Sequence, residues 1–272
     1  KIDFRQFYKT GEDVKLSPKL LELVTKEDPI DYRKNYSLED DKKSSSKLSQ
    51  LTGQNKNSEL FDISRDMGSM EEEKKYNVVL ISVESLSAKF MKRFGNTKNI
   101  TPYLDKLLES SLLFNNFYAT GTRTVRGLES ITLAIPPTPG QAIVRRPDNK
   151  GFHSLGSVFR EHGYESVFFY GGNGFFDNMN DFFSGNGYSI IDKTDFESSE
   201  KTFENAWGLA DEDLFNRSLK EADKSFETKQ SFFYHIMTVS NHKPYSYPDN
   251  KIDIPSLTSR DGAVKYTDFA IG

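Results

Sequence analysis

Polar residues that could carry chemistry follow four apolar stretches that have the composition of strands. They are Glu84 after residues 78–83, residues 121–124 after residues 111–118, the glycine-rich residues 171–173 after residues 165–170, and residues 240–242 after residues 231–239. The carboxyl ends of parallel strands meet at the sheet edge where open α/β sheets bind their ligands. We therefore expect these four stretches to converge on one site.

Glu84 and Thr124 have side chains suited to metal binding and nucleophilic attack. A carboxylate directly after six apolar residues is costly to desolvate unless it is paired or bound to a metal. The alternative is a surface glutamate that caps the next helix. Thr124 lies between Arg123 and Arg126, whose guanidinium groups favour an incoming phosphate or sulfate. A threonine hydroxyl needs a base or a metal to become nucleophilic, and the alternative here is a solvated turn.

The four histidines have different sequence environments. His242 follows a strand and precedes Lys243-Pro244, so it is the best placed for substrate contact or proton transfer. His235 alternates within an apolar strand and is expected to be a core residue. His153 and His162 lie on or beside a helix and are expected to be structural or exposed.

The elements that must position these residues alternate between strand and helix. Helices are predicted over residues 102–108, 129–134, 155–162, 211–225 and 262–272. The alternation predicts an α/β fold with a mostly parallel central sheet flanked by helices. The unbroken apolar run at residues 78–83 predicts a strand that is buried on both faces.

The chain divides by composition near residue 75. Residues 1–75 are polar and are predicted to be an appendage or linker that follows a removed membrane region, with a short amphipathic helix over residues 16–25. The chain begins with Lys1 instead of methionine, from which we infer that an upstream part was removed. The last helix, 262–272, has no return strand after it, so we expect that C-terminal strands of the domain are missing.

Composition excludes several classes of function. The 272 residues include 36 Lys and Arg against 40 Asp and Glu, and this net charge of −4 without a basic stripe argues against nucleic-acid binding. The absence of cysteine excludes disulfides, thiolate metal sites and cysteine nucleophiles. No apolar run reaches the length of about 20 residues that a membrane span needs. The glycines at 171–174 lack the spacing of a dinucleotide-binding loop.

Four segments together resemble the sulfatase-like phosphoglycerol transferases of the alkaline phosphatase superfamily, which include the lipoteichoic acid synthases. The segments are NVVLISVESLSAKF, TPYLDKLLESSLLFNNFYATGTRTVRGLES, WGLADEDLF and FFYHIMTVSNHKPY. Their order and spacing extend the resemblance over residues 76–272. It implies an alkaline phosphatase/sulfatase-like fold, of which this chain holds the N-terminal portion of the catalytic domain.

The resemblance also implies roles for individual residues. Glu84 would ligate a divalent metal, Mn²⁺ first and Mg²⁺ second, and Thr124 would be both metal ligand and nucleophile. Thr124 would attack phosphatidylglycerol, release diacylglycerol and carry phosphoglycerol to an envelope glycan or polyol-phosphate acceptor. His242 would contact the bound phosphoglycerol. Asn178 falls near the position where lipoteichoic acid synthases have a Trp and an Arg that touch the head group.

Two departures from the family pattern limit what the resemblance implies. The family completes its metal site with an Asp-His pair, and no such dipeptide follows His242. We therefore expect the pair in the missing C-terminal part, and expect this fragment alone to bind metal weakly and to be inactive. The nucleophile segment is Thr-Val-Arg-Gly and the chain has no cysteine, which argues against sulfate-ester hydrolysis through formylglycine.

Alternatives remain open at the level of the sequence. One is a phosphoethanolamine transferase or phosphodiesterase that uses the same metal and threonine. Another is an inactive module that binds lipid head groups or glycans. For the leading hypothesis, the resemblance implies an enzyme at the extracytoplasmic face of the bacterial membrane, anchored through N-terminal helices absent from this chain.

Overall fold

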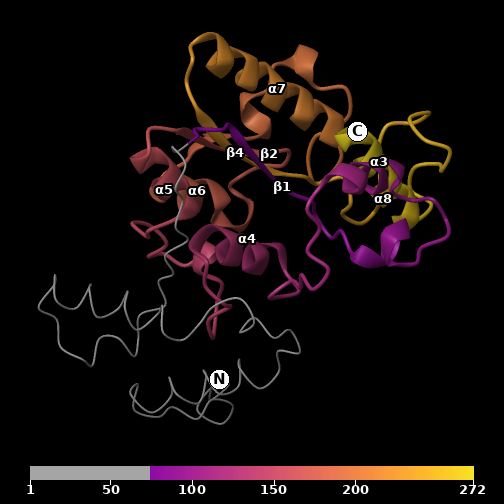
Figure 1. Ribbon diagram of the computed structural model, residues 1–272, viewed down its shortest axis with the longest axis horizontal. Coiled ribbons are helices and arrows are strands. Elements are labelled where there is room, and N and C mark those ends of the chain that lie inside the picture. Colours follow the sequence, from indigo (N-terminus) through magenta and orange to yellow (C-terminus); the bar gives the residue numbers. More distant parts are fainter. Residues whose placement is uncertain (1–73) are drawn as a thin grey trace, which may run out of the picture. The chain divides into compact units, whose positions relative to one another are not determined.

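The computed structural model describes residues 74–272, and four parallel strands form its central sheet (Figure 1). The strands are β1 (Val78–Ser82), β2 (Glu165–Tyr170), β3 (Ser189–Ile191) and β4 (Phe232–Met237), in the spatial order β1-β4-β2-β3. All three pairings between neighbouring strands are parallel. The prediction of an α/β fold with a mostly parallel sheet is confirmed.

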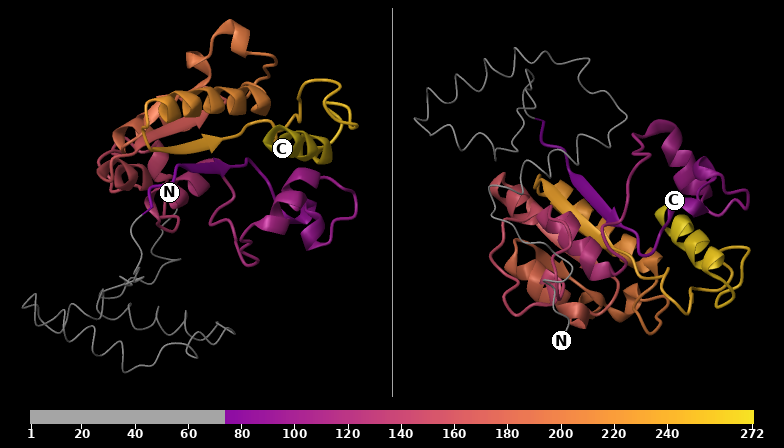
Figure 2. Two further views of the ribbon diagram at one scale, coloured as in Figure 1. Left: turned by 45° about the horizontal axis from the view of Figure 1, so that its top comes forward. Right: turned by 90° about the horizontal axis from the view of Figure 1, so that it is seen from below.

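Helices cover both faces of this sheet (Figure 2). One face packs against α7 (Asp211–Glu227), and the other packs against α4 (Thr124–Leu133), α5 (Leu155–Glu161) and α6 (Met179–Gly185). Because side chains alternate along a strand, Val167 and Phe169 of β2 point to α7, while Phe168 and Tyr170 point to the other layer. Two apolar cores therefore hold the sheet from opposite sides.

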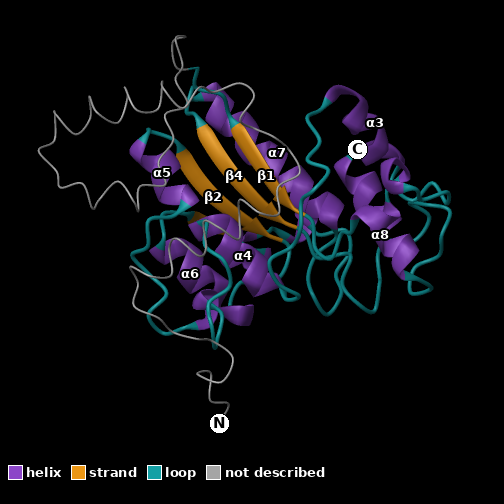
Figure 3. Ribbon diagram, turned by 60° about the horizontal axis from the view of Figure 1, so that its bottom comes forward, coloured by secondary structure: helices purple, strands orange, loops and turns teal. Residues whose placement is uncertain are grey.

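Two further helices, α3 (Pro102–Leu107) and α8 (Arg260–Ile271), pack against each other beside the sheet, and α8 also packs against α7 (Figure 3). The Asp268 carboxylate of α8 accepts hydrogen bonds from the backbone N–H groups of Tyr103 and Leu104, at 2.9 and 2.8 Å. These N–H groups belong to the first turn of α3, where the helix itself offers no acceptor. Short 3₁₀ helices complete the fold at Ala88–Phe90, Lys92–Phe94, Leu108–Ser110, Ile143–Arg145, Phe176–Asn178, Lys193–Asp195 and Ser198–Glu200.

The predicted strand over residues 111–118 is wrong. In the structure this segment has no strand, and its apolar side chains Leu112, Phe114, Phe117 and Tyr118 are exposed. Its composition is that of a strand, but no strand of the described part of the chain pairs with it. A β pattern forms a strand only where a neighbour accepts its backbone hydrogen bonds.

The prediction that the first strand is buried on both faces is also wrong. Val78 and Leu80 of β1 pack against the core on the side of α4, α5 and α6. Val79 and Ile81, on the opposite face, are 50% and 37% exposed. The reason is position: β1 is one of the two edge strands of the sheet that residues 74–272 form, and α7 covers β4 and β2 instead.

Two predictions fall on residues 1–73, which lie outside the described residues: the helix over residues 16–25 and nearly all of the polar appendage. Within residues 74–272, every helix is too short or too polar to cross a bilayer.

His235 is a core residue, as predicted. Its side chain is fully buried on β4 among Phe168, Phe183 and Tyr188, and its Nε2 shares a hydrogen bond of 2.8 Å with the Ser82 hydroxyl of β1. Nδ1 has no hydrogen-bond partner among the described residues. Burial lowers the pKa of His235 from 6.5 to about 3, because the apolar surroundings disfavour the charged ring.

This burial predicts a pH-dependent stability. Below pH 6.5 the unfolded chain binds a proton at His235 that the folded chain does not bind, so stability falls as the pH drops toward 3. We expect this histidine to account for a loss of about 2 kcal/mol in the free energy of unfolding between pH 7 and pH 5. Urea unfolding at the two pH values measures the loss.

His235→Gln should reduce the difference between the two pH values, and His162→Gln, at an exposed histidine, should leave it unchanged. Because the measurement is a difference, a uniform loss of stability in the His235 variant does not obscure it. A His235→Gln chain with the full wild-type pH dependence would contradict the prediction.

Candidate active site

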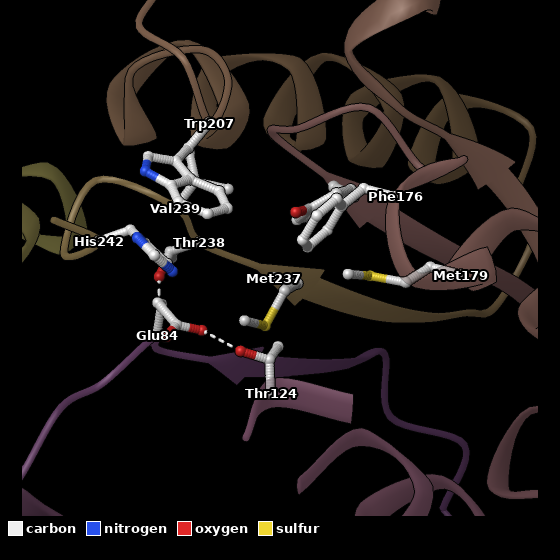
Figure 4. A pocket seen from close by; sticks show the side chains of 10 residues that line it. Glu84, Thr124, Phe176, Met179, Trp207, Met237, Thr238, Val239 and His242 are labelled. Carbon is white, nitrogen blue, oxygen red and sulfur yellow. Dashed lines mark hydrogen bonds between the residues drawn. The ribbon is translucent and has the colours of Figure 1, made fainter. Parts of the chain in front are cut away.

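A cavity lies at the carboxyl ends of β1, β2 and β4, next to the first residue of α4 (Figure 4). Its lining consists of Glu84, Thr124, Tyr170, Phe176, Met179, Trp207, Met237, Thr238, Val239 and His242. Three of these, Glu84, Thr124 and His242, are the residues that the strand-end argument selected. The structure thus brings together side chains that are up to 158 positions apart in the chain (242 − 84).

Thr124 lies at the first position of α4. Arg123 has extended backbone geometry at the N-cap, and its carbonyl accepts the N–H groups of Arg126 and Gly127, which starts the helix there. The predicted helix over residues 129–134 therefore began five positions too late (129 − 124). The N-terminal end of a helix carries a partial positive charge and favours a phosphate, so the hydroxyl lies where an anionic substrate is attracted.

Glu84 holds the Thr124 hydroxyl. Thr124 Oγ1 donates a hydrogen bond to Glu84 Oε2 at 2.9 Å, and the Ser85 hydroxyl donates to Oε1 at 2.8 Å. The backbone N–H of Glu84 donates to Thr238 Oγ1 at 3.0 Å, which ties the end of β1 to the end of β4. Ser85 has a positive φ of 52°, an uncommon conformation for a residue other than glycine, which turns the chain sharply after Glu84.

His242 faces the same cavity from the loop after β4. Its Nδ1 lies 3.1 Å from the carbonyl oxygen of Lys243, and its imidazole lies against the indole of Trp207 (Figure 4). A carbonyl can only accept, so this bond places the proton on Nδ1 and leaves Nε2 for a ligand.

The structure does not bring the other predicted site residues into this cavity. Arg126 donates to the Glu129 carboxylate at 2.7 Å, to the carbonyl of Thr138 at 3.0 Å and to the carbonyl of Gly140. These bonds tie its guanidinium to the loop after α4. Arg123 is exposed at the helix N-cap. Asn178 lines a second cavity with Asn180, Asp181 and Ser184, among others. Their roles in substrate binding stay predictions.

Sequence reasoning missed several lining residues, among them Tyr170, Thr238 and Trp207. Tyr170 is the last residue of β2 and Thr238 directly follows β4, so their place at a strand end was the available signal. Burial raises the pKa of the Tyr170 hydroxyl, and the negative charge of Glu84 raises it further. The phenol is therefore a protonated group beside the Glu84 carboxylate over the whole physiological range.

Asp211 fixes the backbone that leads to His242. Its side chain is fully buried at the start of α7, and its Oδ1 accepts the N–H groups of Val239 and Ser240 at 2.9 and 3.1 Å. Its Oδ2 accepts the Thr267 hydroxyl of α8 at 2.7 Å. Burial raises the pKa of this carboxyl, while the three donors act in the opposite direction. One carboxylate thus joins α7, α8 and the loop after β4.

The Glu84 and Thr124 oxygens have the spacing of neighbouring ligands of a hard cation. Their separation of 2.9 Å matches the distance between adjacent oxygens around a metal with bonds of about 2.1 Å. Mg²⁺ and similar ions take about six oxygen ligands, so these two residues supply part of a coordination shell. Within residues 74–272 no cluster of three or more His, Asp or Glu side chains could hold an ion.

The parallel sheet flanked by helices is shared with solved structures of the alkaline phosphatase superfamily. A protein of that superfamily from Vibrio parahaemolyticus superposes with a TM-score of 0.69 and 38% identity, over 74% of this chain and 50% of that one. The Sulfatase family profile matches residues 76–272, so the chain belongs to the sulfatase family.

Relatives within this family include lipoteichoic acid synthases. Lipoteichoic acid synthase 2 of Bacillus subtilis is 25% identical over 194 residues, which are 69% of this chain and 29% of that protein. The lipoteichoic acid synthase LtaP from Listeria monocytogenes shares the fold, with a TM-score of 0.64 and 21% identity over 73% of this chain and 51% of that one. The chain thus spans under a third of the length of the curated relative. The family and fold that the sequence resemblance implied are confirmed.

Proposed function

We propose that this domain transfers phosphoglycerol from phosphatidylglycerol to an envelope glycan or polymer, through a covalent phosphothreonine at Thr124. The observation that carries the proposal is the hydrogen bond of 2.9 Å between the Thr124 hydroxyl and Glu84, at a helix N-terminus and in a cavity shared with His242. The similarity to lipoteichoic acid synthases supports the choice of phosphoglycerol over other phosphate esters.

Thr124 Oγ1 is the atom that attacks phosphorus in the proposed first step. The bond from Oγ1 to phosphorus forms while the bond from phosphorus to the diacylglycerol oxygen breaks. The hydroxyl proton, which Glu84 Oε2 accepts as a hydrogen bond, leaves Thr124, and the departing oxygen takes up one proton, so that diacylglycerol is released as an alcohol. In the second step, a hydroxyl oxygen of the acceptor bonds to the same phosphorus while the bond from Oγ1 to phosphorus breaks. The acceptor hydroxyl loses its proton and Oγ1 takes one up, which restores the Thr124 hydroxyl.

The surrounding residues would hold the phosphoglycerol group during both steps. The N-terminal end of α4 stabilises negative charge on the phosphate oxygens. His242 Nε2 reaches the bound group from the opposite loop, and the protonated Tyr170 phenol offers a hydrogen-bond donor from β2. Trp207 and Phe176 line the same cavity with apolar surface, which limits the access of water to the phosphothreonine.

Glu84 and Thr124 fit a divalent cation, and we propose that they hold Mn²⁺ or Mg²⁺. Such an ion, when bound, lowers the pKa of a ligating hydroxyl and stabilises charge that develops on the phosphoryl oxygens. The two residues supply hard oxygen ligands, as these ions require. The Asp-His pair implied by the family resemblance does not follow His242 in these 272 residues, so we propose that it comes from outside them.

The proposed substrate requires access to a membrane. Phosphatidylglycerol resides in a bilayer, and an envelope glycan or polyol-phosphate acceptor lies outside the cytoplasm. We therefore propose that the domain acts at the extracytoplasmic face of the bacterial membrane, anchored in the full-length protein by N-terminal helices that are not part of these 272 residues.

The proposal is tested by the fate of labelled lipid. The protein, expressed with any coding sequence that adjoins these residues, is incubated with Mn²⁺ and phosphatidylglycerol labelled in its glycerol phosphate. Release of diacylglycerol, with label bound to Thr124, supports the proposal. A clear preference for phosphatidylethanolamine would assign the domain to phosphoethanolamine transfer instead. If the protein shows no turnover and does not bind Mn²⁺, the domain is a non-catalytic binding module.

The metal ligand can be tested without turnover. Glu84→Gln keeps the shape of the side chain and an acceptor for Thr124, but removes the negative charge. We expect the affinity for Mn²⁺, measured by calorimetric titration, to fall about tenfold or more, because ligand charge sets the affinity for hard cations. Glu161→Gln, at an exposed glutamate on α5, is the matched control and should leave the affinity unchanged. Equal affinities in the two variants would contradict the role of Glu84.

A further inference from the structure

Trp207 is the single tryptophan of the chain, and its indole stacks on the imidazole of His242 (Figure 4). The ring centroids lie 3.5 Å apart with an angle of 33° between the planes. Phe176 meets the indole edge to face, with centroids 5.7 Å apart. His242 therefore has an aromatic support on one side and the cavity beside it.

The two stacked rings also share one hydrogen-bond acceptor. Trp207 Nε1 donates to the carbonyl oxygen of Lys243 at 2.6 Å, and His242 Nδ1 lies 3.1 Å from the same oxygen. Rotation of either ring would break its bond to this carbonyl. The arrangement thus fixes both the plane of the imidazole and the nitrogen that remains for a ligand, which is Nε2.

The loop that carries Trp207 is itself held in place. Asn205 Oδ1 accepts the backbone N–H groups of Trp207 and Gly208 at 2.8 and 3.2 Å, and Asn205 Nδ2 donates to the carbonyl and the hydroxyl of Ser246. Gly208 has a positive φ of 156° and lies so close to Gly171 that an added Cβ would be 2.2 Å from its carbonyl oxygen. The loop is therefore packed between the chain segments that follow β2 and β4.

We propose that Trp207 is a positioning residue for His242, which holds Nε2 of the imidazole ready for the phosphoglycerol group. The inference rests on the proposed function, which assigns His242 to that group. Removal of the indole takes away the ring contact that holds the plane of the imidazole, so it should weaken binding of sn-glycerol 1-phosphate about tenfold.

The stack can be tested in the 272-residue chain without any ligand. The chain has four histidines, so the imidazole signals in a two-dimensional NMR spectrum are few, and His242→Ala identifies the signal of interest. The face of an indole shifts the ring protons of a stacked imidazole upfield. We expect this shift in the wild type, a reduced shift in Trp207→Phe, and none in Trp207→Ala. Phe176→Leu is the control. It removes an aromatic ring that contacts Trp207 but not His242, and it should keep the shift.

Binding of sn-glycerol 1-phosphate in the presence of Mn²⁺ gives the second readout. Trp207→Ala should lose about tenfold in affinity, and Trp207→Phe, which keeps a stacking ring, should recover most of it. Wild-type affinity in Trp207→Ala, or the absence of the upfield shift in the wild type, would overturn the inference even if the ligand binds. A wild-type chain with the shift but no binding would support the stack and count against the proposed function.

Discussion

Replacing Thr124 by valine should reduce the transfer of phosphoglycerol by on the order of 10³-fold or more, because it removes the nucleophile and leaves no other group on its helix turn to attack phosphorus. Valine has nearly the shape of threonine, so the packing of α4 is preserved. The measurement is diacylglycerol release from phosphatidylglycerol, together with the label retained on the protein. Both should fall to background.

Thr122→Val and Thr124→Ser are the controls for this prediction. Thr122 is an exposed hydroxyl two positions away, and its loss should leave both rates unchanged. Serine at position 124 keeps the hydroxyl and should retain measurable turnover. The free energy of unfolding of Thr124→Val should change by only about 1 kcal/mol, the value of one hydrogen bond to Glu84. Full turnover in Thr124→Val would remove the basis of the proposed mechanism.

Replacing Asp211 by alanine should cost about 3–5 kcal/mol in the free energy of unfolding. The substitution leaves the N–H groups of Val239 and Ser240 and the Thr267 hydroxyl without their acceptor. An unsatisfied buried donor costs about 1–3 kcal/mol, and three donors lose their partner together. Urea unfolding followed by circular dichroism measures the change.

Asp223→Ala is the matched control on the same helix. Asp223 is exposed on α7, so its replacement should change stability by no more than about 0.5 kcal/mol. If the Asp211 variant folds, we also expect weaker ligand binding, because the backbone between β4 and His242 loses two of its hydrogen bonds. A stability of Asp211→Ala within 1 kcal/mol of the wild type would show that the three donors find other partners.

The sequence predicted those elements whose pattern is local. The apolar runs of β2 and β4 and the helical periodicity of α5, α7 and α8 are each contained within one segment, so their positions could be read directly. The pairing partner of a strand is not local. Residues 111–118 have the composition of a strand without a partner in the described sheet, and β1 has the composition of a central strand but lies at the edge.

The lining of the candidate site was predictable where a polar residue directly follows a strand, as for Glu84 and His242. Arg126 illustrates the limit: beside Thr124 its charge indicated phosphate binding, whereas in the structure its guanidinium binds Glu129 three positions later, a signal that the sequence already contained. Trp207 could not be assigned from the sequence, because its proposed role depends on a ring contact with a residue 35 positions away (242 − 207).

The order of strands in the sheet has a consequence for how the protein is made. β4 is the last described strand along the chain, yet it lies between β1 and β2, and its Phe233 pairs with Val78 at a separation of 155 residues (233 − 78). During synthesis on the ribosome, β1 cannot pair with β4 until residues 232–237 have emerged. Pairing over such sequence distances is slow. Until it occurs, the unpaired backbone groups of the strand edges can pair incorrectly with other nascent chains. The pocket that holds Glu84 and His242 is thus among the last features to form.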